Sequence, residues 1–236
     1  SMTWPGASMP WPGPASRPER AAMAGQVLAL ASLKGGCGKT TLAVNLAAGL
    51  SAAPFRRGAV GLVDADPQGA LAHWADWGGA PGLPRVQSAG ADPVAAIDRM
   101  ARDHAHVVVD CPPSLDMAVT RRVLERARVV LIPVLPSPLD LWACAETADA
   151  VRQARRRNPD LAAWLLINQA EPASALSRAM SRALAGLEIP VLGCAVRRRA
   201  VFRSAILEGV SVYQLGARGR EAAREIDQVL REVMGT

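Results

Sequence analysis

The chain has 236 residues, half of them hydrophobic, and carries a formal net charge of +6. This size and composition suit one α/β domain with a large core, and a second full domain is not expected. No apolar run is long enough to span a bilayer, and the N-terminus lacks the basic-then-apolar order of a signal peptide, so we expect a soluble protein.

The four cysteines and the distribution of charge indicate the cellular compartment and the kind of partner that the protein binds. The cysteines show no CxxC pair and no metal-ligand spacing, which indicates a reduced cytoplasmic protein. Residues 1–150 hold 13 basic and 13 acidic residues, whereas residues 151–236 hold 14 arginines against 8 acidic residues. A one-sided basic excess is typical of a polyanion partner, most often nucleic acid. The alternative is an arginine-rich surface that is merely solvated.

Residues 1–24 read as an N-terminal arm. Ser1 before Met2 has the form of a cloning remnant, and the following residues are rich in Pro, Gly, Ala and Trp without helical or strand period. We expect this arm to be flexible, or in part a start-site artefact, because Met23 stands just before the first strand. Against that, Trp4 and Trp11 recur in Trp-Pro-Gly contexts of the kind that dock in grooves. The single domain then covers residues 25–236.

Residues 27–33 form an apolar run that predicts a buried strand, followed by glycines and a helical pattern from residue 40. The glycines allow a tight turn that points successive N–H groups inward, and a helix N-terminus follows, so the loop is suited to hold phosphates. The predicted nucleotide-binding residues are Gly35, Gly36, Cys37, Gly38, Lys39, Thr40 and Thr41.

Two lysines distinguish this loop. The Lys39 ammonium is expected to reach the β- and γ-phosphates, and the Thr40 hydroxyl to ligate Mg²⁺. Position 33, where the general phosphate-loop pattern has glycine, is Leu33, and an additional lysine, Lys34, opens the loop. Lys34 and Lys39 are the only lysines in an otherwise arginine-based chain, which favours a role for a compact point charge at both positions.

The run KGGCGKTT resembles the deviant Walker A signature of the ParA/MinD superfamily. The resemblance implies that ATP and Mg²⁺ bind here. It also implies that Lys34 of one subunit contacts the nucleotide phosphates of its partner, so Lys34 and Lys39 both serve catalysis.

A second buried strand, residues 59–63, delivers Asp64 and Asp66 to its C-terminal end, the edge where open α/β sheets bind ligands. VDADPQG resembles the ParA switch I sequence. By that resemblance Asp66 orients or activates the attacking water, and Asp64 supports the Mg²⁺ shell. The alternative is an Asx-Pro turn that only caps the next helix.

The following segments read as scaffold: a helix over residues 71–77, a strand over 85–87 and a helix over 93–103. His104 and His106 lie at the next strand without a third metal ligand spaced to join them, so we interpret them as packing or surface histidines.

That strand, HVVVD, ends in Asp110, which is expected to hold Mg²⁺ through a water. DCPPSLD also matches the ParA pattern. Cys111 would suit an iron–sulfur ligand, but the second cysteine is not evident, so packing is the better account.

Residues 129–134 form another apolar strand, and a long helix follows over 140–157. VLIPVLPSPLDLWA resembles the compact ParF-like branch of the ParA proteins. The strand 163–168 then brings Asn168 to the binding edge, where relatives contact the adenine. A plain turn is nearly as good an explanation of Asn168.

A helix over 177–187 and a strand over 190–195 precede a cluster of arginines. RRRAVFRSAILEGVSV resembles the C-terminal region of the ParF-like branch, and Phe202, Ile206 and Leu207 are expected to face the core. One or more of the consecutive arginines could instead serve the nucleotide. The predicted DNA-binding residues are Arg197, Arg198, Arg199 and Arg203, of which Arg203 is the best single candidate.

The last helix, residues 221–234, has apolar residues at helical spacing with mixed charges between them. It does not look like the basic membrane-targeting tail of MinD. Alternating strands and helices predict a doubly wound, mainly parallel sheet with helices on both faces, a P-loop NTPase fold.

The resemblance runs from about residue 26 to the C-terminus and lacks a helix-turn-helix domain. It implies a slow Mg²⁺-dependent ATPase, a homodimer in the ATP state that binds nucleoid DNA non-specifically, and a cargo-bound partner protein that stimulates hydrolysis. Plasmid, chromosome, carboxysome and other assemblies all remain open as cargo. The alternatives are a MinD-like membrane-cycling ATPase, a metal-cluster carrier, and an adaptor that binds nucleotide only as a structural clamp.

Overall fold

The computed structural model describes residues 25–78, 82–113, 117–137, 140–171, 184 and 187–235. The N-terminal arm with Trp4 and Trp11, and nearly all of the helix predicted over residues 177–187, lie outside the described residues.

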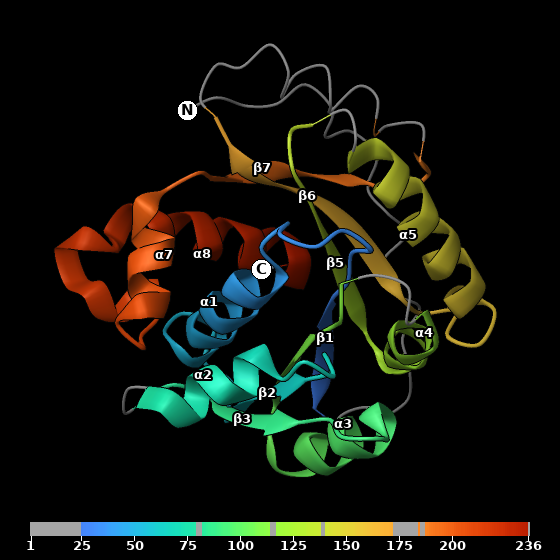
Figure 1. The fold of residues 1–236 in the computed structure, drawn as a ribbon, viewed down its shortest axis with the longest axis horizontal. Coiled ribbons are helices and arrows are strands. Elements are labelled where there is room, and N and C mark those ends of the chain that lie inside the picture. Colours follow the sequence, from blue (N-terminus) through green and yellow to red (C-terminus); the bar gives the residue numbers. More distant parts are fainter. Residues whose placement is uncertain are drawn as a thin grey trace.

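A seven-stranded sheet forms the centre of the molecule, with the strand order β3-β2-β4-β1-β5-β6-β7 (Figure 1). All of its described strand pairs are parallel, which confirms the predicted fold class. The strands are β1 (Gln26–Leu30), β2 (Val60–Asp64), β3 (Arg85–Ser88), β4 (His106–Asp110), β5 (Val129–Val134), β6 (Ala162–Ala170) and β7 (Val191–Arg197).

Helices cover both faces of the sheet. In Figure 1, α3, α4 and α5 lie on one side of the sheet, and α1, α2, α7 and α8 lie on the other. In the described part of the chain, no helix is both long and apolar enough to cross a membrane. The helices are α1 (Lys39–Ser51), α2 (Ala70–Gly78), α3 (Pro93–Asp103), α4 (Met117–Arg126), α5 (Asp140–Arg155), α7 (Ala200–Leu207), α8 (Arg220–Met234) and the 3₁₀ helix η3 (Val212–Arg218).

Each central strand contributes to two cores because successive side chains point to opposite faces. In β4, Val107 and Val109 pack into the core beneath α3 to α5, whereas Val108 packs into the core beneath α1 and α8. Burial on both faces explains why the strands read as nearly continuous apolar runs. The apolar run after residue 26 does not stay in strand to residue 33, because the chain leaves β1 at Leu30 to form the glycine loop.

Two features of the helices differ from the sequence analysis. No helix was predicted for α4, although its Val123 and Leu124 are fully buried. In α7, Phe202 is buried as expected, but Leu207 is 88% exposed, so its predicted orientation toward the core is wrong. Each helical residue turns the side chain by roughly 100°, so Leu207 cannot share the inward face that Phe202 and Ala205 define.

The helix that follows the glycine loop is fixed along its whole length. Asn45 of α1 is fully buried, and its Oδ1 accepts a hydrogen bond from the Val212 N–H of η3 at 2.9 Å. A Cβ on Gly49 would lie 2.5 Å from the Tyr213 hydroxyl oxygen and 2.7 Å from Leu230 Cδ1, so α1 packs closely against η3 and α8. Glycine at position 49 permits this approach.

Candidate nucleotide-binding site

The predicted site residues come together where three central strands end. Residue pairing aligns Leu30 of β1 and Asp64 of β2 with Asp110 of β4. Because these strands are parallel, their carboxyl ends share one edge, which is where open α/β sheets bind ligands. The glycine loop leaves β1 at this edge, between Asp110 on one side and β5 on the other.

Two glycines of the loop adopt left-handed backbone conformations, with φ of 77° at Gly36 and 92° at Gly38. A Cβ on Gly38 would also lie 2.5 Å from the Asn168 Nδ2. Both the backbone angle and the approach of Asn168 therefore require glycine at position 38.

The Lys39 side chain is buried inside this loop, with only 6% of the residue exposed. Its Nζ donates to the carbonyl oxygens of Ser32 and Lys34, each 3.1 Å away. Its remaining contact is the Cys37 Sγ at 3.9 Å, a weak acceptor. The ammonium is thus held at the centre of the loop while retaining hydrogen-bonding capacity for an anion such as a phosphate.

Thr40 and Asp110 form the polar pair next to Lys39. The Thr40 hydroxyl donates to Asp110 Oδ2 at 2.6 Å, and Asp110 is only 3% exposed. The second carboxylate oxygen, Oδ1, is buried without a hydrogen-bond partner. Burial raises the pKa of Asp110 to about 7, against the opposing effect of the Thr40 hydrogen bond.

This pair fits a hydrated Mg²⁺. Mg²⁺ is usually held by one or two carboxylates together with phosphate oxygens and water. The unpartnered Oδ1 of Asp110 and the hydroxyl of Thr40 supply oxygen atoms of that kind at the mouth of the phosphate loop. Among the described residues, no group of three or more His, Cys, Asp or Glu side chains is arranged to hold a metal.

Asp64 and Asp66 organise the loop that follows β2. Asp64 is 1% exposed and accepts from the Asp66 N–H at 3.1 Å and the Ala72 N–H at 2.9 Å. Burial raises its pKa, and these hydrogen bonds oppose the shift. Asp66 accepts from the Gln68 N–H at 2.9 Å, so the Asx turn weighed for this sequence is present. The water-activating role of Asp66 remains a prediction.

Lys34 is paired within its own subunit. Its Nζ lies 2.6 Å from Asp140 Oδ2 at the start of α5, with side chains 33% and 3% exposed, respectively. The N–H of the preceding residue, Leu33, donates to the Thr147 hydroxyl at 3.4 Å. The first residues of the loop are therefore anchored on α5. Contact of Lys34 with a second subunit remains a prediction, and it requires the pair with Asp140 to open.

Asn168 braces the opposite side of the loop. It is 5% exposed, and its Nδ2 donates to the Cys37 carbonyl at 2.7 Å. The next residue, Gln169, has a left-handed φ of 53° and donates from Nε2 to the Gly36 carbonyl at 3.4 Å. Asn168 thus supports the loop, and its contact with adenine remains a prediction.

Sequence reasoning missed the supporting roles of Asp140, Thr147 and Gln169. A polar residue directly after a buried strand was the available signal for Gln169, and an acid opening a helix near the same edge was the signal for Asp140. Thr147 gave no signal, because it lies inside a helix. Cys111 is 1% exposed, and burial raises the pKa of its thiol, as expected for a packing residue.

The predicted DNA-binding arginines differ in their contacts. Glu225 of α8 accepts from Arg199 Nη2 at 2.8 Å and lies 3.7 Å from Arg197 Nε. Arg198 lies 3.7 Å from Glu171. Arg203 is exposed and makes no ion pair with any residue that the structure describes. The structure thus gathers these arginines around the end of β7 and α7, and Arg203 is the one without an acidic partner there.

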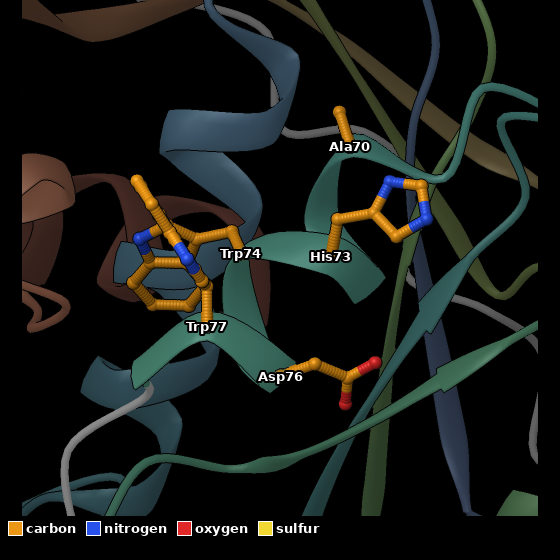
Figure 2. A pocket seen from close by; sticks show the side chains of 5 residues that line it. All are labelled: Ala70, His73, Trp74, Asp76 and Trp77. Atoms are coloured by element: carbon orange, nitrogen blue, oxygen red, sulfur yellow. The ribbon is translucent and has the colours of Figure 1, made fainter.

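A shallow hollow of about 490 Å³ lies on α2, the helix that follows the Asp66 loop (Figure 2). Trp77 is 96% exposed, whereas the Trp74 indole N–H donates to the Ile206 carbonyl of α7 at 2.7 Å. In Figure 2 the two indoles lie to one side of α2 and His73 and Asp76 to the other. The hollow is lined by Ala70, His73, Trp74, Asp76 and Trp77.

Comparison with known proteins places the chain in a family. The model of the CobQ/CobB/MinD/ParA nucleotide-binding domain matches residues 28–212. The "Maintenance of carboxysome distribution protein A" of Halothiobacillus neapolitanus is 55% identical over 210 residues, covering 88% of this chain and 95% of that protein. The protein of the same name from Gloeobacter kilaueensis is 36% identical over 213 residues, covering 88% of this chain and 94% of that protein.

Among solved structures, the ATP complex of Cyanothece McdA matches with a TM-score of 0.65 and 18% identity. The match covers 89% of this chain and 96% of that one. At this identity the likeness supports the fold.

Replacing Asp110 by Asn should stabilise the nucleotide-free protein in a pH-dependent way. The folded-state pKa of about 7 lies above the ordinary value of 3.8, so ionising Asp110 costs the folded state stability as pH rises from about 4 to 7. Asn cannot ionise and can still accept from Thr40. We expect Asp110→Asn to gain roughly 2 kcal/mol over wild type at pH 8 and much less at pH 5.

Urea unfolding at both pH values measures this difference. Thr40→Val is the control, because it removes the hydrogen bond and leaves the carboxylate. An equal gain for Asp110→Asn at pH 5 and pH 8 would contradict the role of ionisation.

Proposed function

The chain belongs to the CobQ/CobB/MinD/ParA nucleotide-binding family, and we propose that it is a ParA-type ATPase that distributes carboxysomes in the cell. The observation that carries this proposal is the 55% identity with the Halothiobacillus neapolitanus protein over 95% of that protein's length. The site supports it, because the residues that such an ATPase needs for phosphate and metal lie at one sheet edge.

ATP would bind with its phosphates in the glycine loop. Loop N–H groups and the Lys39 ammonium would hold the phosphates, and the Thr40 hydroxyl and Asp110 would hold Mg²⁺. When bound, Mg²⁺ neutralises charge that develops on the phosphate oxygens. Asp66, half-buried at the same edge, would position the attacking water, and Asp64 would keep the Asp66 backbone in place through its hydrogen bond.

The ATP state would be a homodimer in which Lys34 contacts the phosphates of the partner subunit. Two phosphate-loaded faces repel each other, and a crossing lysine offsets that charge. The ion pair with Asp140 must open first, and the partner's phosphates would have to offset the cost of leaving the buried Asp140 carboxylate without Lys34. Lys34 therefore has a resting position within its own subunit and a second position across the interface.

Non-specific DNA would bind to the arginines around the end of β7 and α7. Arg203 offers an exposed guanidinium, and the chain after residue 150 has an excess of six basic residues, 14 against 8. Phosphate contacts of this kind are independent of sequence and sensitive to salt. Dimerisation would double the surface, which makes DNA binding depend on ATP and gives a nucleoid-associated cytoplasmic protein.

A cargo-bound partner protein would stimulate the slow hydrolysis and so release the chain from DNA.

A MinD-like membrane cycle is the second candidate function. Membrane-surface helices have a basic polar face, whereas the final helix α8 has four acidic residues among its arginines: Glu221, Glu225, Asp227 and Glu232. An adaptor with nucleotide as a clamp would not need Asp66 and Asp110 beside Lys39. ATP turnover measurements separate that alternative from an ATPase.

The two lysines should fail in different ways. Lys39→Ala removes the ammonium buried in the loop, so we expect loss of ATP binding by at least tenfold. Lys34→Ala should bind ATP but fail to form the ATP dimer. Binding of a fluorescent ATP analogue and light scattering after size exclusion measure the two properties.

Asp140→Asn is the matched control, because it releases Lys34 without removing it. This variant should still dimerise with ATP. Equal loss of nucleotide affinity in Lys34→Ala and Lys39→Ala would count against a crossing lysine.

Reversing the charge at Arg203 should weaken DNA binding without affecting dimerisation. We expect Arg203→Glu to lower the affinity for non-specific DNA at least tenfold and to reduce its salt dependence. Arg156→Glu carries the same charge change at an exposed position just beyond α5. If DNA binding survives in Arg203→Glu, or if ATP-dependent dimerisation is lost with it, Arg203 does not contact phosphates in the proposed way.

The proposed carboxysome cargo can be tested by replacing the 55% identical relative with this chain in its own cells. Expressed in Halothiobacillus neapolitanus cells that lack their own 55% identical protein, this chain should restore an even distribution of labelled carboxysomes. The Lys39→Ala variant should leave them clustered. Clustered carboxysomes in the presence of a chain that binds ATP and DNA normally would refute the proposed cargo and leave the ATPase assignment intact.

A further inference from the structure

A second cavity, of about 440 Å³, lies at the amino edge of the sheet, opposite the edge that carries the phosphate loop. It opens where β1 and β4 begin, since Gln26 and His106 are register partners there. The ends of α1 and α8 close its other sides. Its lining consists of Gln26, Leu50, Pro54, Phe55, Arg57, His106, Arg231 and Met234.

The cavity combines an apolar wall with cationic groups. Leu50 and Phe55 are buried at 1% and 6% exposure and form part of the wall. Arg57 and Arg231 are exposed, and neither makes an ion pair with a residue in the described part of the chain. The acidic neighbours of Arg231 on α8 are engaged elsewhere, because Asp227 accepts from Tyr213 and Glu232 accepts from the Gly193 N–H.

His106 contributes a largely buried ring to the lining of the cavity. The residue is only 4% exposed, and its Nε2 is buried with no hydrogen-bond partner. An imidazole nitrogen buried in this way costs free energy unless something pairs with it. Burial and the positive charge of Arg57 both lower the pKa of His106, so the ring is neutral at pH 7 and Arg57 lies near it.

We propose that this cavity binds a small organic carboxylate with an apolar body, held by the Arg57 and Arg231 guanidinium groups at its mouth, with the His106 ring in its lining. Guanidinium groups pair with carboxylates in a bidentate geometry, and the apolar wall accepts an aromatic or branched aliphatic group. The volume is in the range of small-molecule sites. Nucleotide binding does not compete with this assignment, because the phosphate loop lies at the other end of α1.

The two helices that end at this cavity also carry the two proposed functional surfaces. The 13-residue α1 begins in the phosphate loop with Lys39 and reaches the cavity with Leu50, about 17 Å away along the helix. The α8 helix carries Glu225, which binds Arg199, and reaches the cavity with Arg231 and Met234. A carboxylate would thus contact helices that extend to both surfaces while leaving the ATP site free.

Isothermal titration of the full chain with 3-phenylpropionate tests the proposal. The uncharged 3-phenylpropionamide has the same shape and should bind at least tenfold more weakly. Arg57→Gln and Arg231→Gln should each lower the affinity for the carboxylate roughly tenfold. Both residues are exposed, so both variants should fold, as unchanged ATP binding would verify.

Arg156→Gln is the matched control, since it removes one exposed arginine just after the end of α5. The α5 helix lies on the face of the sheet opposite α1 and α8 (Figure 1). The Arg156→Gln variant should bind the carboxylate like wild type, and saturating ATP and Mg²⁺ should not displace the ligand. Four results would each overturn the proposal: no binding of the carboxylate, equal binding of the amide, wild-type affinity in both cavity variants, or competition with ATP.

Discussion

The hydrogen bond between the Thr40 hydroxyl and the buried Asp110 carboxylate is the contact on which the site depends. It joins the first turn of α1 to the end of β4, and it does so at the centre of the sheet, where β1 lies beside β4. Only one oxygen of Asp110 is satisfied, and the carboxylate is costly to keep ionised there. A site with this unpaired oxygen favours a cation, and the same burial that destabilises the charge strengthens its pull on a metal.

Hydrogen bonds and an ion pair within the same chain hold the glycine loop beside this pair in place. The carbonyl groups of Ser32 and Lys34 hold Lys39, while Asp140 of α5 holds Lys34 and Asn168 of β6 holds the Cys37 carbonyl. Two elements outside the loop therefore help to fix it. These contacts keep the Lys39 ammonium inside the loop and the Lys34 ammonium on α5. Phosphate binding would exchange neutral acceptors for charged ones at Lys39 and so strengthen its hydrogen bonds.

The parts of the site that directly follow a buried strand could be predicted from the sequence. The glycine loop and the acids after β2 and β4 follow buried strands directly, so parallel pairing alone brings Lys39, Asp64 and Asp110 to one edge. The contacts of Asp140, Thr147 and Glu225 could not be read in this way, since each joins residues at least 26 positions apart. The predicted orientation of Leu207 was wrong for a related reason. An apolar residue near a helix end is readily assigned to the core, whichever face of the helix it occupies.

Glu225 sets a limit on how the arginine cluster can act. This largely buried carboxylate binds Arg199 and the Arg197 backbone, and it lies on the helix that packs against α1. Its charge is shared between two arginines, so the pair keeps a net positive charge while Arg199 is fixed in place. A fixed guanidinium loses little conformational entropy when a phosphate approaches, but its hydrogen-bonding groups are partly used. Arg199 is therefore suited to position the end of β7, and in the proposed DNA complex direct phosphate contact would fall to the exposed arginines beside it.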